Sequence, residues 1–180
     1  MKKLIVSFAF VLIALTSYAQ SSSEHLTFKG IPIEGSMTEF CQKLKAKGFT
    51  SIGSENNLAL FMGDFTGRNA TIGVTATDDG KSVFAVAVLF DPSGEWNTLV
   101  NTYNYYKDLY TRKYGNPTIS KEKNPAHSDS NTALMAEVHQ GTVVWGSAWE
   151  VTGGDIELSI EKTSEEFYKL KYCSTVVYMV

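Results

Sequence analysis

Three histidines are the residues of this sequence best suited to metal binding or acid–base chemistry: His25, His127 and His139. Glu137 and His139 lie two residues apart, so both would point the same way from a strand. A zinc site needs at least one further ligand, and the sequence does not nominate one. We therefore predict no metal site.

Hydrolysis is the other chemistry that the residue types suggest. Residues 127–129 read His-Ser-Asp, but adjacent residues cannot converge on one substrate atom as a catalytic triad must. Glu150, Glu157 and Glu161 are predicted to share one face of a sheet, where paired carboxylates could cleave a glycoside. Small neighbours and the lack of an evident cleft favour a solvated acidic face instead. The sequence thus predicts no catalytic residues and no cofactor.

Two amphipathic helices are expected to support whatever site exists. In the segment 35–49, Ser36 and Glu39 form a capping box, and apolar residues follow at helical spacing. In the segment 93–114, Ser93 can cap a helix whose aromatic and aliphatic residues recur at steps of three and four. A glycine that can end the helix stands at the end of each segment.

Strand-like segments follow each helix. The first group comprises residues 49–54, 58–65, 70–77 and 82–90, and the second comprises 117–123, 132–140, 142–151, 155–162 and 172–180. Strands interrupted by single helices indicate the α+β class. We expect two helix-plus-strands units, residues 35–92 and 93–180, that form an internal repeat. They share one antiparallel sheet with the helices on one face, in one compact domain preceded by an N-terminal arm at 20–34.

Two tryptophans in the second unit could form a binding platform or belong to the core. A two-residue loop at Gly153-Gly154 would pair Trp149 with Leu158 and place Trp145 on the same, aliphatic face. The opposite face would carry the small and acidic residues. We therefore predict that both indoles lie in the core beneath a helix.

The equivalent hairpin of the first unit leads to a less regular result. With Asp79-Gly80 as its loop, the face opposite Ile72 and Val74 becomes an apolar stripe. Such a stripe is either covered by the N-terminal arm and loops or is a contact surface for a partner. The candidate binding patch consists of Phe61, Phe65, Phe84, Val86, Val88 and Phe90.

The first residues have the layout of a cleavable secretory signal. Lys2 and Lys3 precede an apolar run from Leu4 to Leu15, and a small-residue cleavage site ends at Ala19. A helix over that run would be about 18 Å long, short of a hydrocarbon core of about 30 Å. We expect residues 1–19 to be removed, which leaves a periplasmic or secreted protein without a transmembrane anchor.

The charge balance excludes one class of partner. The whole chain has a net charge of −3, and removal of the leader makes it more negative. A basic field for nucleic acid or anionic membranes is therefore not expected.

Cys41 and Cys173 are the only cysteines of the chain. In an exported protein they could form a disulfide, and closing so long a loop would stabilise the fold by about 4–5 kcal/mol. Two buried free thiols are the alternative, since the sequence contains no distance between them.

The residues HLTFKGIPIEGSMTEFCQKLKAKGF, at positions 25–49, resemble the opening of uncharacterised exported proteins of Bacteroides-type bacteria. Tandem helix-plus-strands units on one sheet are similar in architecture to the β-lactamase-inhibitor-protein-like group. That resemblance implies binding of another protein through an exposed sheet face, without catalysis. The chain lacks a recognisable inhibitor loop, which leaves the target open.

The leading functional hypothesis is an exported, non-enzymatic module that binds an envelope or extracellular protein through an exposed sheet face. The alternative is a small-ligand carrier or hydrolase with a pocket between the second helix and the sheet. Tyr103, Tyr106 and Tyr110 would line that pocket.

Overall fold

The computed structural model describes residues 25–122, 130–163 and 172–180. Its elements are β1 (Thr27–Phe28), β2 (Ile31–Pro32), α1 (Met37–Ala46), β3 (Thr50–Glu55), β4 (Leu58–Phe65), β5 (Arg68–Ala76), β6 (Val83–Phe90), α2 (Trp96–Tyr114), β7 (Ile119–Lys121), α3 (Asn131–Gln140), β8 (Gly146–Val151), β9 (Gly154–Lys162) and β10 (Tyr172–Met179). No helix within these ranges combines the length and apolar composition of a membrane span.

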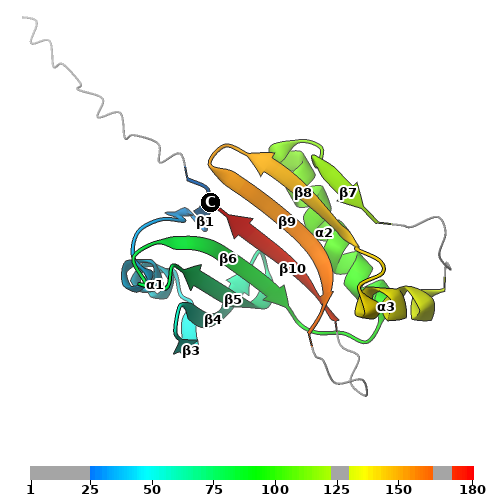
Figure 1. Cartoon of the computed structure of the whole chain (residues 1–180), viewed down its shortest axis with the longest axis horizontal. Coiled ribbons are helices and arrows are strands. Elements are labelled where there is room, and N and C mark those ends of the chain that lie inside the picture. The colour runs from blue at the N-terminus through cyan, green and yellow to red at the C-terminus, as the bar shows by residue number, and fades with distance from the viewer. Residues whose placement is uncertain (1–24, 123–129, 164–171) are drawn as a thin grey trace, which may run out of the picture.

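One large antiparallel sheet dominates the described part of the chain. Its eight strands follow the order β3-β4-β5-β6-β10-β9-β8-β7, while β1 and β2 form a separate hairpin. The strands of the first and second halves meet where β6 pairs with β10 (Figure 1). α2 lies behind β8–β10 in that view, and α1 packs on β5. The predicted α+β class, with helices on one face of a shared antiparallel sheet, is confirmed.

Both predicted helices form. The Ser36 hydroxyl accepts a hydrogen bond of 3.3 Å from the Glu39 amide at the start of α1, as the capping box predicts. α2 begins two residues after the expected position, because Glu95 occupies the cap position and its amide donates to the Ser93 hydroxyl. Gly115 ends α2 with a positive φ of 88°.

The predicted strand at 132–140 was wrong, because these residues form helix α3. Alanine, leucine, methionine and glutamate in this segment favour a helix over a strand. Leu134 and Val138, one helical turn apart, are both buried, and α3 packs on β9 and α2. Gly141 adopts the left-handed conformation that stops the helix.

The N-terminal hairpin closes the core at one end of the sheet. Phe28 and Phe65 stack with ring centroids 5.6 Å apart and nearly parallel planes. The turn residues Lys29 and Gly30 both have positive φ, as the two-residue turn between Phe28 and Ile31 requires. The hairpin thus covers strand residues that would otherwise face water.

Of the two alternatives for the candidate binding patch, the structure shows the covered one, because five of its six residues belong to the core. Only Phe84 is exposed, at 39%, whereas the following five are at most 5% exposed: Phe61, Phe65, Val86, Val88 and Phe90. A β-bulge explains why the predicted facing of the β6 residues was wrong. Ala76 pairs with Val83 as predicted, but Thr75 pairs with Ala85, so the extra residue Phe84 reverses the facing of the rest of β6.

Trp149 lies in the core as predicted, although the predicted turn between β8 and β9 was misplaced. The tight turn lies at Thr152-Gly153, since Val151 pairs with Gly154 and Trp149 with Ile156. This pairing differs from the prediction by two residues, which preserves the face. Trp149 is 1% exposed and its indole nitrogen donates to the Gly115 carbonyl at 3.0 Å. Trp145 is partly buried and meets Trp96 edge-on.

Cys41 is a free thiol, so the structure does not contain the Cys41–Cys173 bridge that the sequence left open. Cys41 lies in α1, which packs on β5, and β6 separates β5 from β10. The side chain of Cys173 lies outside the described part of the chain.

Candidate binding surfaces

The sheet face opposite the helices, here called the open face, is the first candidate. One ladder crosses it from β4 to β8 through residues that pair directly: Leu60, Gly73, Ala87, Val177, Glu157 and Ala148. The flanking ladders add Leu58, Thr75, Ala85 and Met179 on one side, and Met62, Thr71 and Leu89 on the other. The side chains that β4 and β6 contribute to these ladders are all apolar, and β10 adds Val177 and Met179.

Most side chains at the centre of the open face are small, so this part of the face is shallow. Leu58 and Met62 are 39% and 42% exposed, which is high for apolar side chains on a strand that has neighbours on both sides. A methyl group added at Gly73 would touch Leu58, Leu60 and Ala87 only at 3.7–3.9 Å. The centre of this face is therefore a shallow apolar surface with no large side chain projecting from it.

The other half of the open face is acidic. Asp155, Glu157 and Glu161 alternate along β9, and Glu150 pairs with Asp155 from β8; all four are exposed. A hollow of about 240 Å³ lies beside them over β7–β9, where Gly146 and Ala148 contribute little volume. The prediction of a solvated acidic face for Glu150, Glu157 and Glu161 agrees with this exposure.

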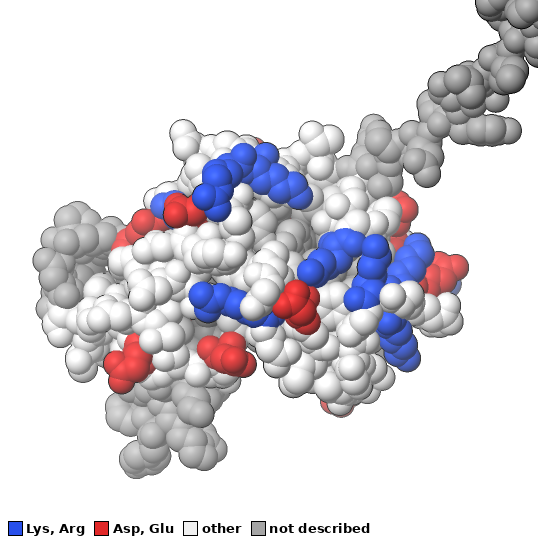
Figure 2. Space-filling view, turned by 180° about the vertical axis from the view of Figure 1, so that it is seen from behind, with Lys and Arg blue, Asp and Glu red and all other residues white. Residues whose placement is uncertain are grey.

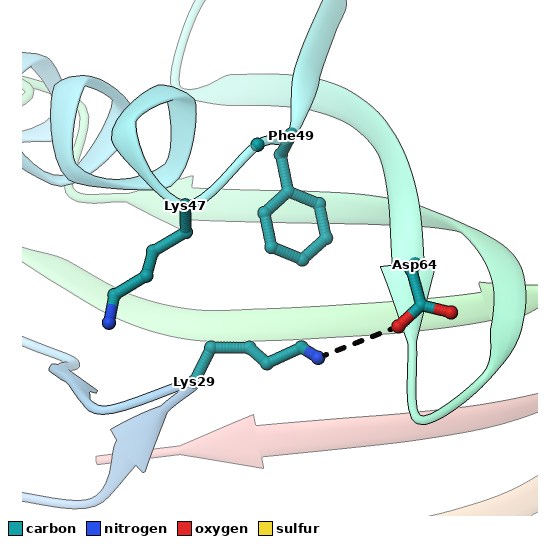
Figure 3. Close-up of a pocket in the computed structure, with 5 residues that line it drawn as sticks. Lys29, Lys47, Phe49 and Asp64 are labelled. Atoms are coloured by element: carbon teal, nitrogen blue, oxygen red, sulfur yellow. Dashed lines mark ion pairs between the residues drawn. The ribbon is translucent and has the colours of Figure 1, made fainter.

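The helix side of the molecule has the opposite charge character. Figure 2 shows lysine and arginine side chains gathered across this side, with fewer carboxylates among them. One hollow there, of about 310 Å³, is lined by Lys29, Lys47, Phe49 and Asp64 with Gly48 (Figure 3). The ammonium of Lys29 points towards the Asp64 carboxylate at 3.9 Å, while Lys47 points away from that pair.

A second hollow on the helix side matches the pocket that the sequence analysis raised as an alternative. It measures about 240 Å³ and lies between α2, the N-terminal hairpin and β10. Tyr106 and Tyr110 line it as predicted, but Tyr103 does not. Tyr114 and Tyr178, which the prediction omitted, complete its aromatic wall.

Tyr103 instead belongs to a polar network that joins α2 to β7 and β8. Its hydroxyl lies 2.7 Å from the Ser147 hydroxyl and donates to the Glu122 carboxylate at 3.1 Å. Lys107 also binds Glu122, and the Ser120 hydroxyl donates to the same oxygen at 2.9 Å. Several donors thus share the Glu122 carboxylate. These contacts link the end of the edge strand β7 to α2.

The pKa shifts in this network are those of a structural ion pair. Burial would raise the pKa of Glu122, but hydrogen bonds from Lys107, Ser120 and Tyr103, with the charge of Lys107, outweigh it and lower the pKa. Burial raises the pKa of Tyr103 well above its ordinary value. Glu122 therefore stays ionised and Tyr103 protonated near neutral pH, so neither is poised to accept a proton from Ser147.

The two histidines of the described residues, His25 and His139, are not part of a metal-binding group. Within the described ranges no group of three or more histidine, cysteine or carboxylate side chains could hold a metal ion. His25 lies 4.0 Å from Glu34, and His139 lies on α3. Residues 127–129, which carry the His-Ser-Asp sequence, lie outside the described residues.

The sequence analysis placed the acidic residues on the outer side of the sheet but did not identify the apolar residues that β4 contributes to the open face. Leu58, Leu60 and Met62 alternate with Ala59 and Phe61, so strand periodicity alone shows two apolar faces. Side-chain size could have distinguished the two faces, since the aromatic residues of β4 are all on the covered face.

Known proteins add no assignment. No family model, no curated protein and no solved structure matches this chain.

Proposed function

We propose that this protein is an exported, non-enzymatic binding module that engages another envelope or extracellular protein through the open face. The observation that carries the proposal is that the helices of the described residues cover one side of an eight-stranded sheet, whose other side is apolar over β4 and β6. Export follows from the signal-like residues 1–19.

The dimensions of the open face support a protein partner over a small ligand. Eight strands at about 4.8 Å spacing span roughly 34 Å, and the three ladders described above cover about 14 Å along the strands. These lengths enclose roughly 480 Å², more than half of the roughly 800 Å² that one side of a standard protein interface buries, and the margins of the face would supply the rest. A flat surface of this size offers no enclosure for a small molecule.

Charge defines the chemistry of the expected partner. Burial of exposed aliphatic carbon yields about 25 cal/mol per Å², so Leu58, Met62 and their neighbours favour an aliphatic patch on the partner. The carboxylates of β8 and β9, including Glu157, favour lysine or arginine beside that patch. We therefore expect a protein with an aliphatic centre and a basic flank, and an association that weakens as salt rises.

Capture from envelope extract followed by measurement with the purified partner tests the proposal. Immobilised protein is compared with two variants of the open face, Met62→Asp and Glu157→Lys, and with a matched control, Lys43→Asp, on the exposed side of α1. The parent and control should bind the same protein, Met62→Asp should lose it, and Glu157→Lys should bind more weakly with a smaller salt dependence.

Two outcomes contradict this account. If both variants of the open face bind every captured protein as tightly as the parent does, another surface is responsible. If sedimentation shows a dimer that Met62→Asp dissociates, the open face serves self-association instead of a different partner.

A further inference from the structure

The pocket between α2 and the N-terminal hairpin, here called the tyrosine pocket, has an unused hydrogen-bond donor. Its wall includes Tyr106, Tyr110, Tyr114 and Tyr178, and the last of these is 5% exposed. The hydroxyls of Tyr110 and Tyr178 are hydrogen-bonded to each other. Two hydroxyls have two protons, but only one proton can lie between the two oxygens.

The second proton of this pair has no acceptor among the described residues. Tyr106 differs, because its hydroxyl lies 3.2 Å from the Phe65 carbonyl and 2.9 Å from the Thr66 hydroxyl. A buried hydroxyl without an acceptor is unfavourable by about 1–3 kcal/mol. The pair of Tyr110 and Tyr178 is therefore able to donate to a molecule that enters the pocket.

Protonation keeps that donor available. Burial raises the pKa of Tyr110 and that of Tyr178 well above the ordinary tyrosine value. Both hydroxyls therefore stay protonated over the neutral range.

Two lysines at the pocket give it a positive field. Lys29 is held there by the tight turn of the N-terminal hairpin, with its ammonium 5.6 Å from the centre of the Phe65 ring. Lys113, in the last turn of α2, lies 4.7 Å from the centre of the Tyr114 ring. Asp64 offsets part of the charge of Lys29, and the field at the pocket stays positive.

We propose that the tyrosine pocket binds a small organic carboxylate. The carboxylate group lies against Lys29 and Lys113, the body of the ligand contacts the tyrosine rings, and an oxygen accepts the unused hydroxyl proton of Tyr110 or Tyr178. Because Asp64 already offsets part of the charge of Lys29, the site suits a monoanion better than a phosphate dianion. The volume of about 240 Å³ is below the range of pockets for drug-sized ligands, which suits a compound of a single ring or comparable size.

This site is independent of the proposed partner surface. Phe65 and Tyr178 belong to the covered side of the sheet, whereas Met62 belongs to the open face. The Met62→Asp variant should therefore leave binding in the tyrosine pocket unchanged, and variants of the pocket should leave partner capture unchanged.

Titration by two-dimensional NMR with phenylacetate as the probe tests the proposal. Amide signals of Gly30, Thr66 and Lys113 should shift together and saturate below about 10 mM. Phenylacetamide, which has the same shape without the charge, should bind at least about tenfold more weakly, and phenyl phosphate should not bind more tightly than phenylacetate.

Variants distinguish the assigned groups. Tyr110→Phe and Tyr178→Phe each leave one hydroxyl proton free, so each single variant should retain binding. The double variant has no such proton and should bind about tenfold more weakly, while its fold persists because both polar groups are removed together. Lys113→Gln should weaken binding, Asp64→Asn should strengthen it about twofold, and Lys45→Gln, away from the pocket, should change nothing.

The proposal is overturned if none of the three amide signals shifts at the highest concentration, or if phenylacetamide binds as well as phenylacetate. Equal affinity of the double phenylalanine variant and the parent would remove the hydroxyl pair from the site. Tighter binding of phenyl phosphate would assign the pocket to phosphate esters instead.

Discussion

The two faces of the large sheet are built from alternate residues of the same strands, yet they differ in size and charge. On β4 the covered face presents Phe61 and Phe65, while the open face presents Leu58, Leu60 and Met62. Aromatic side chains fill the space between strands and helices, where they stack on one another. The open face has aliphatic and small side chains, with carboxylates on β9.

Because of this difference, we expect the covered face to determine the stability of the fold and the open face to determine what the protein binds. Substitutions on the covered face should be felt by the whole fold, because each residue there touches the core cluster. Substitutions on the open face should leave the fold almost unchanged and alter only what binds there. The separation can be tested with pairs of variants that differ in face but share a strand or a residue type.

The largest effect is expected from adjacent residues of β4. Phe61→Ala should lower the free energy of unfolding by about 3–5 kcal/mol, because the ring is 1% exposed and its loss leaves a cavity. Met62→Ala should change it by less than about 1 kcal/mol, since that side chain is 42% exposed. Urea denaturation followed by tryptophan fluorescence measures both, and equal losses would contradict the distinction between the faces.

Two glycines provide a second pair with effects of opposite sign. A methyl group at Gly63 would come within 2.6 Å of the Phe49 ring, so Gly63→Ala should destabilise the protein by about 1–3 kcal/mol. Gly73→Ala on the open face meets only ordinary contacts and should stabilise the strand by about 0.5–1 kcal/mol. The midpoint temperature of thermal denaturation should be lower than that of the parent for Gly63→Ala and higher for Gly73→Ala. Changes of the same sign in both variants would contradict this comparison.

A smaller effect is expected from the Glu122 network on the helix side. Because the pKa of Glu122 is lower in the folded state, its contribution is present above the unfolded value of about 4.3 and is lost as pH falls through the folded pKa. The group is partly exposed, so we expect about 1 kcal/mol or less.

Replacement by Gln isolates that contribution. The Glu122→Gln variant should be less stable than the parent at pH 7, and the difference should shrink below about pH 4. Denaturation curves at several pH values measure it. A constant difference between parent and variant across this range would show that the carboxylate charge contributes nothing.

Local sequence signals predicted the elements more reliably than their facing. The Ser36 cap and the glycine after α2 indicated the two predicted helices, α1 and α2, because those signals act within one turn of chain. A turn misplaced by two residues preserved the facing of Trp149. The single extra residue at Phe84 reversed the facing of β6, and no local pattern distinguishes such a bulge from regular strand.

The remaining features depend on contacts between distant segments. α3 was predicted as a strand because its two buried residues, Leu134 and Val138, also fit an extended apolar segment. The tyrosine pocket was predicted in part, since the helical stripe included Tyr106 and Tyr110. Tyr178 and Lys29 come from opposite ends of the described chain, so their approach to α2 was not visible in the sequence.

Hydroxyl-radical footprinting with mass spectrometry tests the central claim most directly, because it measures side-chain exposure on both faces in one experiment. With rates normalised to the unfolded chain, Met62 and Phe84 should be labelled rapidly, while Phe61 and Trp149 should be strongly protected. Rapid labelling of Phe61 and Trp149 together with protection of Met62 would show that the two faces are assigned the wrong way round.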